Sequence, residues 1–148
     1  MISIGGFLKN ASRFRSNISA LRRKGSPAKA LGLREAVVNF GTFDFGFTCI
    51  VGKRSAVEAY GLWYFGDHLP DDGQDTRGMY WSFGNRTLIW IPRKPTTPEM
   101  IGALAHEVTH VIRAMFVTWA GLPLTRDTDE AYAHAMGYAM RELLTALK

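Results

Sequence analysis

Two histidines with a glutamate between them stand in the C-terminal half of the chain. The segment His106-Glu107-Val108-Thr109-His110 has the pattern H-E-x-x-H. On a helix, residues four apart lie on one side about one turn apart, so both imidazoles can reach one ion. Neutral imidazoles bind zinc at about 2.0–2.1 Å. The Glu107 carboxylate, rotated round the helix, reaches the water beside the ion and can accept its proton.

The residues around this motif predict a long helix that positions it. Thr97 suits the N-cap, Pro98 the first helical position and Glu99 the positive end of the helix dipole. Gly121 and Pro123 end the helix, which therefore runs to about residue 120. One apolar stripe at helical spacing should pack on a sheet, with the two histidines on the other face. Its members are Ile101, Leu104, Val108, Val111, Ile112, Met115 and Trp119.

Catalytic zinc needs a third protein ligand and one open position. A second helix is predicted from Asp127 or Thr128 to about Leu147, and it carries Glu130 on the face opposite its apolar stripe. That stripe consists of Tyr132, Met136, Ala139, Met140, Leu143 and Leu147. Glu130 is the first choice for the third ligand. Alternatively, Asp127-x-x-Glu130 is a capping box, in which Glu130 bonds back to the helix start.

Other side chains are candidates for supporting roles. His134, one turn after Glu130, is the second choice for a ligand; it could instead donate a hydrogen bond to the reacting oxygen or orient a ligand. Tyr138 is the candidate phenol near the site. Arg113, one turn after His110, could bind a substrate carboxylate or pair with an acid.

Composition limits the remaining possibilities. A chain of 148 residues, 47% hydrophobic and 21% charged, is long enough for one globular domain with a real core. The single cysteine, Cys49, excludes an internal disulfide framework and a cysteine-rich zinc site. No stretch has the roughly 18 to 20 unbroken apolar residues of a membrane helix, so no membrane span is expected.

The basic residues gather at the start of the chain. Residues 1–34 hold eight of the eighteen lysines and arginines and no acid, whereas residues 35–148 carry ten basic and thirteen acidic groups. We therefore expect a basic N-terminal arm (1–34) before the domain (35–148). The arm is a solvated helix, a surface for nucleic acid or an acidic partner, or a targeting segment; its composition fits all three.

The middle of the chain predicts a small, mainly antiparallel sheet. Residues 37–40, 45–51 and 62–65 are typical of strands, and Met79–Phe83 and Arg86–Ile91 form a hairpin around Gly84-Asn85. Residues 57–60 fit either a strand or a helical turn. Gly52-Lys53-Arg54-Ser55 does not match a phosphate-binding P-loop, because five residues rather than four separate Gly46 from Gly52.

The motif followed by Glu130 in Asp129-Glu130-Ala131, twenty residues after His110, resembles the gluzincin branch of zinc metallopeptidases. The short form also looks like small metallopeptidase-like proteins of phages and prophages. This resemblance implies an α+β, zincin-like minimal domain, in which two C-terminal helices hold one zinc ion. It implies His106, His110 and Glu130 as zinc ligands and Glu107 as general base. It also implies an edge strand that holds an extended peptide, for which residues 86–91 are the matching segment.

The sequence thus predicts a zinc-dependent hydrolase acting on a peptide or protein substrate, with Glu107 activating water and His134 or Tyr138 assisting. Zinc-dependent hydrolysis of a non-peptide bond is an alternative prediction from the same residues. The alternative is a non-catalytic, metal-stabilised phage or host-interaction protein, whose arm binds nucleic acid or an acidic partner. A cytoplasmic location is expected, in the host if the chain is phage-encoded.

Overall fold

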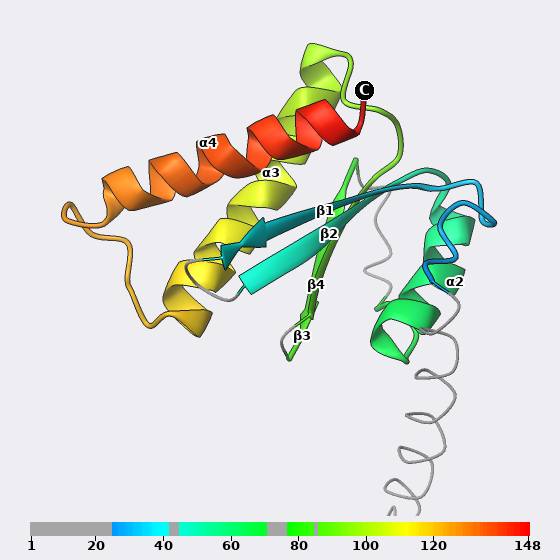
Figure 1. The fold of residues 1–148 in the computed structure, drawn as a ribbon, viewed down its shortest axis with the longest axis horizontal. Helices are drawn as coiled ribbons and strands as arrows, with labels where there is room; N and C mark the ends of the chain where they lie inside the picture. Colours follow the sequence, from blue (N-terminus) through cyan, green and yellow to red (C-terminus); the bar gives the residue numbers. More distant parts are fainter. Residues whose placement is uncertain (1–24, 42–44, 71–76, 85) are drawn as a thin grey trace, which may run out of the picture.

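The protein is an α+β domain built on a four-stranded sheet in the order β1-β2-β4-β3 (Figure 1). The computed structural model describes residues 25–41, 45–70, 77–84 and 86–148. The elements are β1 (Arg34–Phe40), β2 (Phe45–Val51), α2 (Arg54–Phe65), β3 (Met79–Phe83), β4 (Arg86–Ile91), α3 (Pro98–Arg113), the π-helix η2 (Ala114–Trp119) and α4 (Asp129–Ala146). The predicted fold class, a small sheet with two C-terminal helices, is confirmed.

The sheet is mixed. β1 pairs antiparallel with β2, and β3 pairs antiparallel with β4, with Phe83 opposite Arg86 across the predicted hairpin turn. Gly84 has a φ of 60°, which suits such a turn, while Asn85 lies outside the described residues. The β2–β4 pairing is parallel, with Thr48 opposite Leu88. The expectation of a mainly antiparallel sheet is therefore confirmed, with one parallel pair at its centre.

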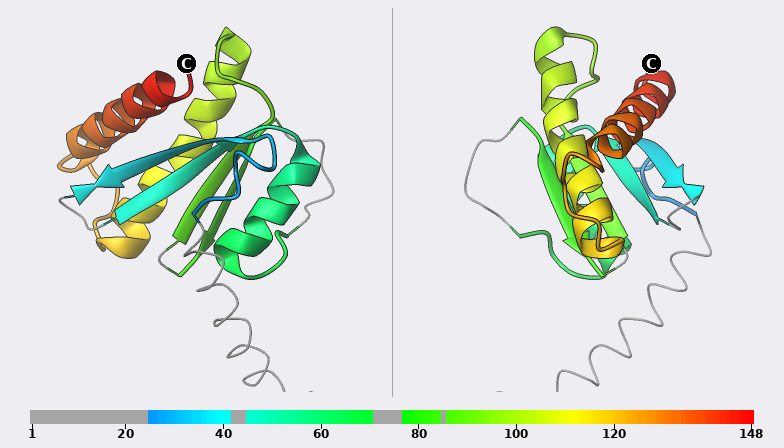
Figure 2. Two further views of the ribbon diagram at one scale, coloured as in Figure 1. Left: turned by 45° about the vertical axis from the view of Figure 1, so that its right-hand side comes forward. Right: turned by 90° about the vertical axis from the view of Figure 1, so that its left-hand side faces the viewer.

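Helices cover both faces of this sheet. α3 and α4 pack on one face and α2 on the other, as Figures 1 and 2 show. Alternate residues of the central strands point to opposite faces: Ile89 and Ile91 enter the core under α3 and α4, and Leu88 and Trp90 enter the core under α2. β4 is thus buried on both sides, as its continuous apolar sequence requires.

Residues 62–65 belong to α2, so the predicted strand there is wrong, and the ambiguous residues 57–60 are helical as well. The aromatic residues at the helix end favoured a strand by propensity, but they contact one another at helical spacing. The Tyr60 ring lies 5.2 Å from that of Trp63 and 5.8 Å from that of Tyr64. Tertiary packing of these rings therefore overrides local β-propensity.

The predicted motif helix is confirmed over its full length, as α3 continued by η2. The Thr97 side chain accepts a hydrogen bond from the Met100 amide at 3.3 Å, and Pro98 occupies the first turn. In length and composition Pro98–Trp119 is a candidate membrane span, found among the described residues. In its most apolar window 44% is buried inside the molecule, and residues of this helix such as Leu104 and Val108 belong to the core on one face of the sheet.

The last ten residues of the predicted arm, 25–34, are described and lead into the folded domain. Ala28 and Leu33 are buried in the core under α2, and the Leu33 amide bonds the Ala28 carbonyl at 2.8 Å. Residues 1–24, which carry most of the arm's basic side chains, lie outside the described residues.

Candidate functional site

The two motif histidines lie next to each other on the exposed face of α3. Their Nε2 atoms are 3.2 Å apart, and their rings are nearly perpendicular, with centroids 4.9 Å apart. The His110 ring also stacks on Tyr80 of β3, at 5.6 Å between centroids. An element of the sheet therefore orients the second histidine, and both reactive nitrogens point to one place.

This spacing fits a shared zinc ion. Two nitrogens bound to a tetrahedral zinc at about 2.0–2.1 Å stand about 3.3 Å apart. Burial lowers the pKa of His110, and the neighbouring His106 and Arg113 lower it further. A lowered pKa favours the neutral imidazole, which is the form that binds a metal. Geometry and protonation therefore both suit His106 and His110 as ligands.

Glu107 is buried between α3 and the edge of the sheet, with 6% of the residue exposed. It lies against Gly78: a Cβ atom there would be 2.9 Å from both Cγ and Oε1 of Glu107. Burial raises the pKa of Glu107, against a smaller opposite effect of His106. A carboxyl group with a raised pKa is a better proton acceptor for catalysis at neutral pH than an exposed one.

A surface cavity of about 430 Å³ opens beside the motif. Its walls include His106 and Glu107 of α3, Arg77 and Gly78 before β3, and Glu99 at the start of α3. Arg77 and Glu99 form an ion pair at 3.2 Å across it. The cavity therefore brings a water-sized ligand within reach of the motif's carboxylate and one imidazole.

β3, and not β4, is the edge strand next to this cavity, so the prediction that residues 86–91 form the edge is wrong. β4 is interior because its other side pairs with β2. Both strands of the hairpin were identified, but which of them pairs with a distant strand does not follow from local pattern. Tyr80 and Gly78, which contact the motif residues, were not identified as site residues for the same reason.

Glu130 lies away from the histidine pair. It starts α4 as an exposed side chain and pairs with His134 at 3.0 Å, both side chains being about 80% exposed. Ala135, Ala139 and Leu143 face the core instead, which turns Glu130 towards solvent. In the part of the chain that the structure describes, no three His, Cys, Asp or Glu side chains gather to hold a metal.

The capping-box alternative is not formed either. Thr128 is the N-cap residue of α4, which places Glu130 at the second helical position instead of the third. The Thr128 hydroxyl donates to the Pro123 carbonyl at 2.7 Å and makes no cap bond within the helix. Neither sequence interpretation of Glu130 therefore describes its position in this structure.

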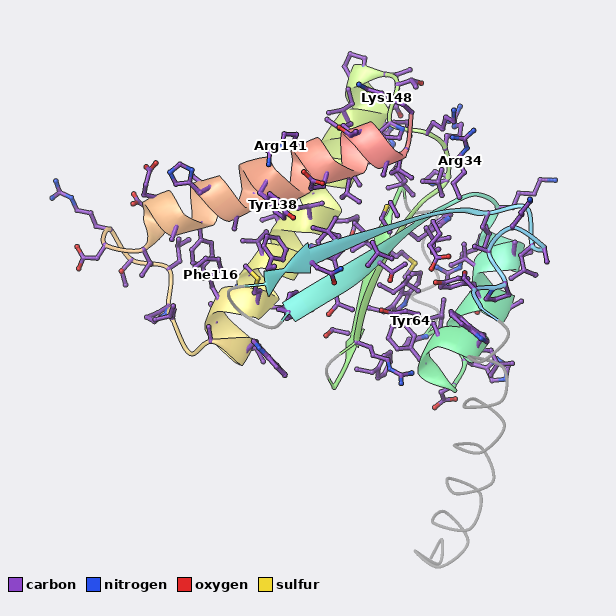
Figure 3. The ribbon with its side chains drawn as sticks, in the orientation of Figure 1. Arg34, Tyr64, Phe116, Tyr138, Arg141 and Lys148 are labelled. Atoms are coloured by element: carbon purple, nitrogen blue, oxygen red, sulfur yellow. The ribbon has the colours of Figure 1, made fainter. Side chains whose placement is uncertain are left out.

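His134 and Tyr138 line a different cavity, of about 400 Å³, between α4 and β1. Figure 3 shows Tyr138 beside β1, where its hydroxyl donates to the Asn39 carbonyl at 3.2 Å and its ring packs edge-on against Phe40. This cavity shares no lining residue with the one beside Glu107. Tyr138 is thus held by packing with β1, away from the motif.

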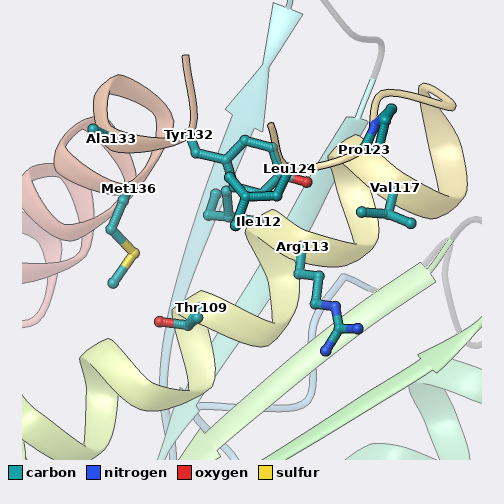
Figure 4. Close-up of a pocket in the computed structure, with 9 residues that line it drawn as sticks. All are labelled: Thr109, Ile112, Arg113, Val117, Pro123, Leu124, Tyr132, Ala133 and Met136. Atoms are coloured by element: carbon teal, nitrogen blue, oxygen red, sulfur yellow. The ribbon is translucent and has the colours of Figure 1, made fainter. Parts of the chain in front are cut away.

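A third, mostly apolar groove of about 540 Å³ lies between α3 and α4 (Figure 4). Thr109 and Arg113 of α3 line it together with Leu124, Ala133 and Met136. Arg113 makes no ion pair with any described residue, so the predicted pairing with an acid is not formed. It stays available as a cation close to His110.

Comparison of the chain with protein-family models, with curated proteins and with solved structures gave no match. The resemblance to gluzincins therefore stays a prediction, carried by the motif and its geometry alone.

Proposed function

We propose that the protein is a zinc-dependent hydrolase that cleaves peptide bonds, with His106 and His110 as zinc ligands and Glu107 as general base. The observation that carries the proposal is the 3.2 Å separation of the two Nε2 atoms, beside a buried glutamate that borders a cavity. A direct hydrogen bond between the two imidazoles would also explain the short distance between their Nε2 atoms. It would not explain why Glu107 is buried at the border of the cavity beside them.

Zinc and the residues of the site would have distinct roles in hydrolysis. Bound zinc would supply a Lewis acid that polarises the scissile carbonyl and the attacking water. Glu107 accepts the proton of that water at a carboxylate oxygen and then gives it to the leaving amine. Tyr80 holds His110 in place by stacking, and Gly78 leaves space for the Glu107 side chain.

The third ligand is proposed to be Glu130, as the resemblance implies. The exposed ion pair between Glu130 and His134 would not prevent Glu130 from binding zinc instead, because exposed ion pairs contribute only about 0–1 kcal/mol of stability. Coordination requires the first turn of α4 to rotate as well as to approach α3, because Glu130 lies on the exposed face of α4 and the opposite, apolar face packs in the core. Zinc bound by the wild type but released faster from Glu130→Gln would support this assignment.

A peptide substrate is supported by the free edge of β3. Among the described residues this strand pairs only with β4, so its outer edge can accept an extended chain by strand addition, next to the cavity of Glu107. The alternative of a binding module, with or without metal, predicts no turnover at all.

The test is turnover of a peptide mixture by the zinc-loaded protein and by Glu107→Gln, with cleavage followed by mass spectrometry. Loss of the general base should lower turnover by about 10²- to 10⁴-fold while zinc content stays unchanged. A wild type that binds zinc but cleaves neither peptides nor small esters and amides would favour the binding module.

A further inference from the structure

The carboxyl ends of β2 and β4 meet at a point where the chain turns to opposite faces of the sheet. The two strands are parallel neighbours, with Val51 opposite Ile91 at their ends. β2 continues into α2 on one face, and β4 continues into α3 on the other (Figure 1). In open sheets with parallel strands, this divergence leaves a crevice in which ligands bind.

A cavity of about 620 Å³ occupies this crevice. Gly52, Lys53 and Arg54 line it after β2, and Pro92 and Arg93 line it after β4. The chain segments that form it are thus the two that leave the parallel strands. The Arg77–Glu99 ion pair borders both this cavity and the cavity beside Glu107, so the two cavities are neighbours.

The walls of this cavity are strongly basic. Four of its side chains are positive and one, Glu99, is negative; Arg77 pairs with that acid. Arg54 pairs with Glu58 at 2.9 Å. Lys53 and Arg93 form no ion pair with any described residue. In the described part of the chain, two exposed cations therefore face the crevice without an acid paired to them.

Two further features suit an anion here. The Arg54 guanidinium lies over Trp81 at 5.0 Å and over Trp90 at 5.5 Å, so its plane is held by the rings. Lys53 is the N-cap of α2, which has no side-chain cap and no acid in its first turn. The positive end of this twelve-residue helix is therefore also uncompensated.

We propose that this crevice binds the phosphate group of a small phosphorylated molecule, with Lys53 and Arg93 as the direct cationic contacts. These two cations, unpaired among the described residues, suit a divalent anion such as a phosphate ester better than a single carboxylate. The amides of the first turn of α2 add donors from the side of β2, while Arg54 stays paired with Glu58. The site is independent of the zinc proposal, because it shares no residue with the H-E-x-x-H motif.

The test is an NMR titration of the full chain with inorganic phosphate and with diphosphate, at ionic strength matched with sodium chloride. The Trp90 indole N–H is the reporter, because it donates to the Gly52 carbonyl at 2.8 Å inside the crevice wall. We expect the chemical shift of this proton to change saturably with ligand concentration, and the Kd to be lower for diphosphate than for phosphate. The double variant Lys53→Ala, Arg93→Ala should weaken binding by about tenfold or more.

Two controls make the outcome decisive. The double variant Lys29→Ala, Arg126→Ala removes the same charge from two exposed positions outside the crevice, so its affinity should match that of the wild type. His106→Ala should also bind diphosphate normally, even if the zinc site fails. Equal weakening by both double variants, or a Trp90 signal that moves only as it does with chloride, would overturn the proposal. So would binding of a single-stranded oligonucleotide through Lys53 and Arg93 without any response to diphosphate.

Discussion

At the scale of single residues, the site depends on close contacts between the motif and the strand beside it. Glu107 is buried against Gly78, where a Cβ atom would lie 2.9 Å from its Cγ and Oε1. His110 is oriented by the Tyr80 ring. The sequence predicted the three motif residues from spacing alone, but these two neighbours lie in β3 and directly before it, about thirty residues earlier. No local pattern links them to the motif, so only the fold reveals them.

Gly78→Ala tests the Glu107 contact. The new methyl group would lie 2.9 Å from Glu107 and 3.1 Å from the Trp90 carbonyl, so the carboxylate must move. We expect a loss of about 1–3 kcal/mol in the free energy of unfolding, measured in urea, together with reduced hydrolase activity. Gly137→Ala is the matched control, because nothing lies within 4 Å of a Cβ there. It should stabilise α4 by about 0.5–1 kcal/mol, and an equal effect of both substitutions would contradict the contact.

Cys49 should be inert in the folded protein. It is fully buried in the core under α3 and α4, and burial raises the pKa of its thiol far above the ordinary range. The thiolate is the reactive form, so a thiol reagent should label the native chain only as fast as the chain opens. Labelling rates with and without denaturant check this. Immediate labelling at neutral pH without denaturant would show that β2 is not in the core.

At the scale of elements, the helix that carries the motif is also the main core helix. Its buried stripe was largely predicted: Leu104, Val108 and Met115 are fully buried, whereas Ile101 and Trp119 at the two ends are partly exposed. The 3.6-residue period identified this face because one side of α3 is polar. α2 lacks such contrast in its aromatic second half, which is why residues 62–65 were mistaken for a strand.

The positions of β4 and of Glu130 were hard to predict for a common physical reason. Residues 86–91 were expected at the edge of the sheet, which is wrong, and Glu130 was expected beside the histidine pair, which would require α4 to turn from its position in this structure; both depend on how distant elements meet. β4 became interior by pairing with β2. The rotation of α4 is set by the burial of Ala135, Ala139 and Leu143, which turns Glu130 outwards. Sequence spacing fixes which residues share a helix face, but not which neighbour that face meets.

Leu104→Ala tests which face of α3 is buried against the sheet. Leu104 is fully buried, so truncation should cost about 2–5 kcal/mol of unfolding free energy, measured by urea denaturation. Ile101→Ala, three residues earlier and 37% exposed, is the control and should cost much less. If Ile101→Ala proved the more destabilising of the two, the orientation of α3 on the sheet would be wrong, and with it the exposed position of the histidines.

At the scale of the whole molecule, two cavities adjoin at the Arg77–Glu99 pair. One opens beside Glu107 and His106, and the other is the basic crevice where β2 and β4 end. The start of α3 forms a wall of both. The fold thus places the proposed reaction and the proposed phosphate site on neighbouring parts of one surface. Composition alone located the positive charge in the first 34 residues and gave no sign of the crevice.

Elemental analysis of zinc in the purified protein is the decisive experiment for the metal site. We expect one zinc per chain in the wild type and in His68→Ala, which removes an exposed histidine outside the motif. We expect near-complete loss of zinc in His106→Ala. Equal zinc content in His106→Ala and His68→Ala, or a wild type that takes up no zinc when it is supplied, would contradict this expectation.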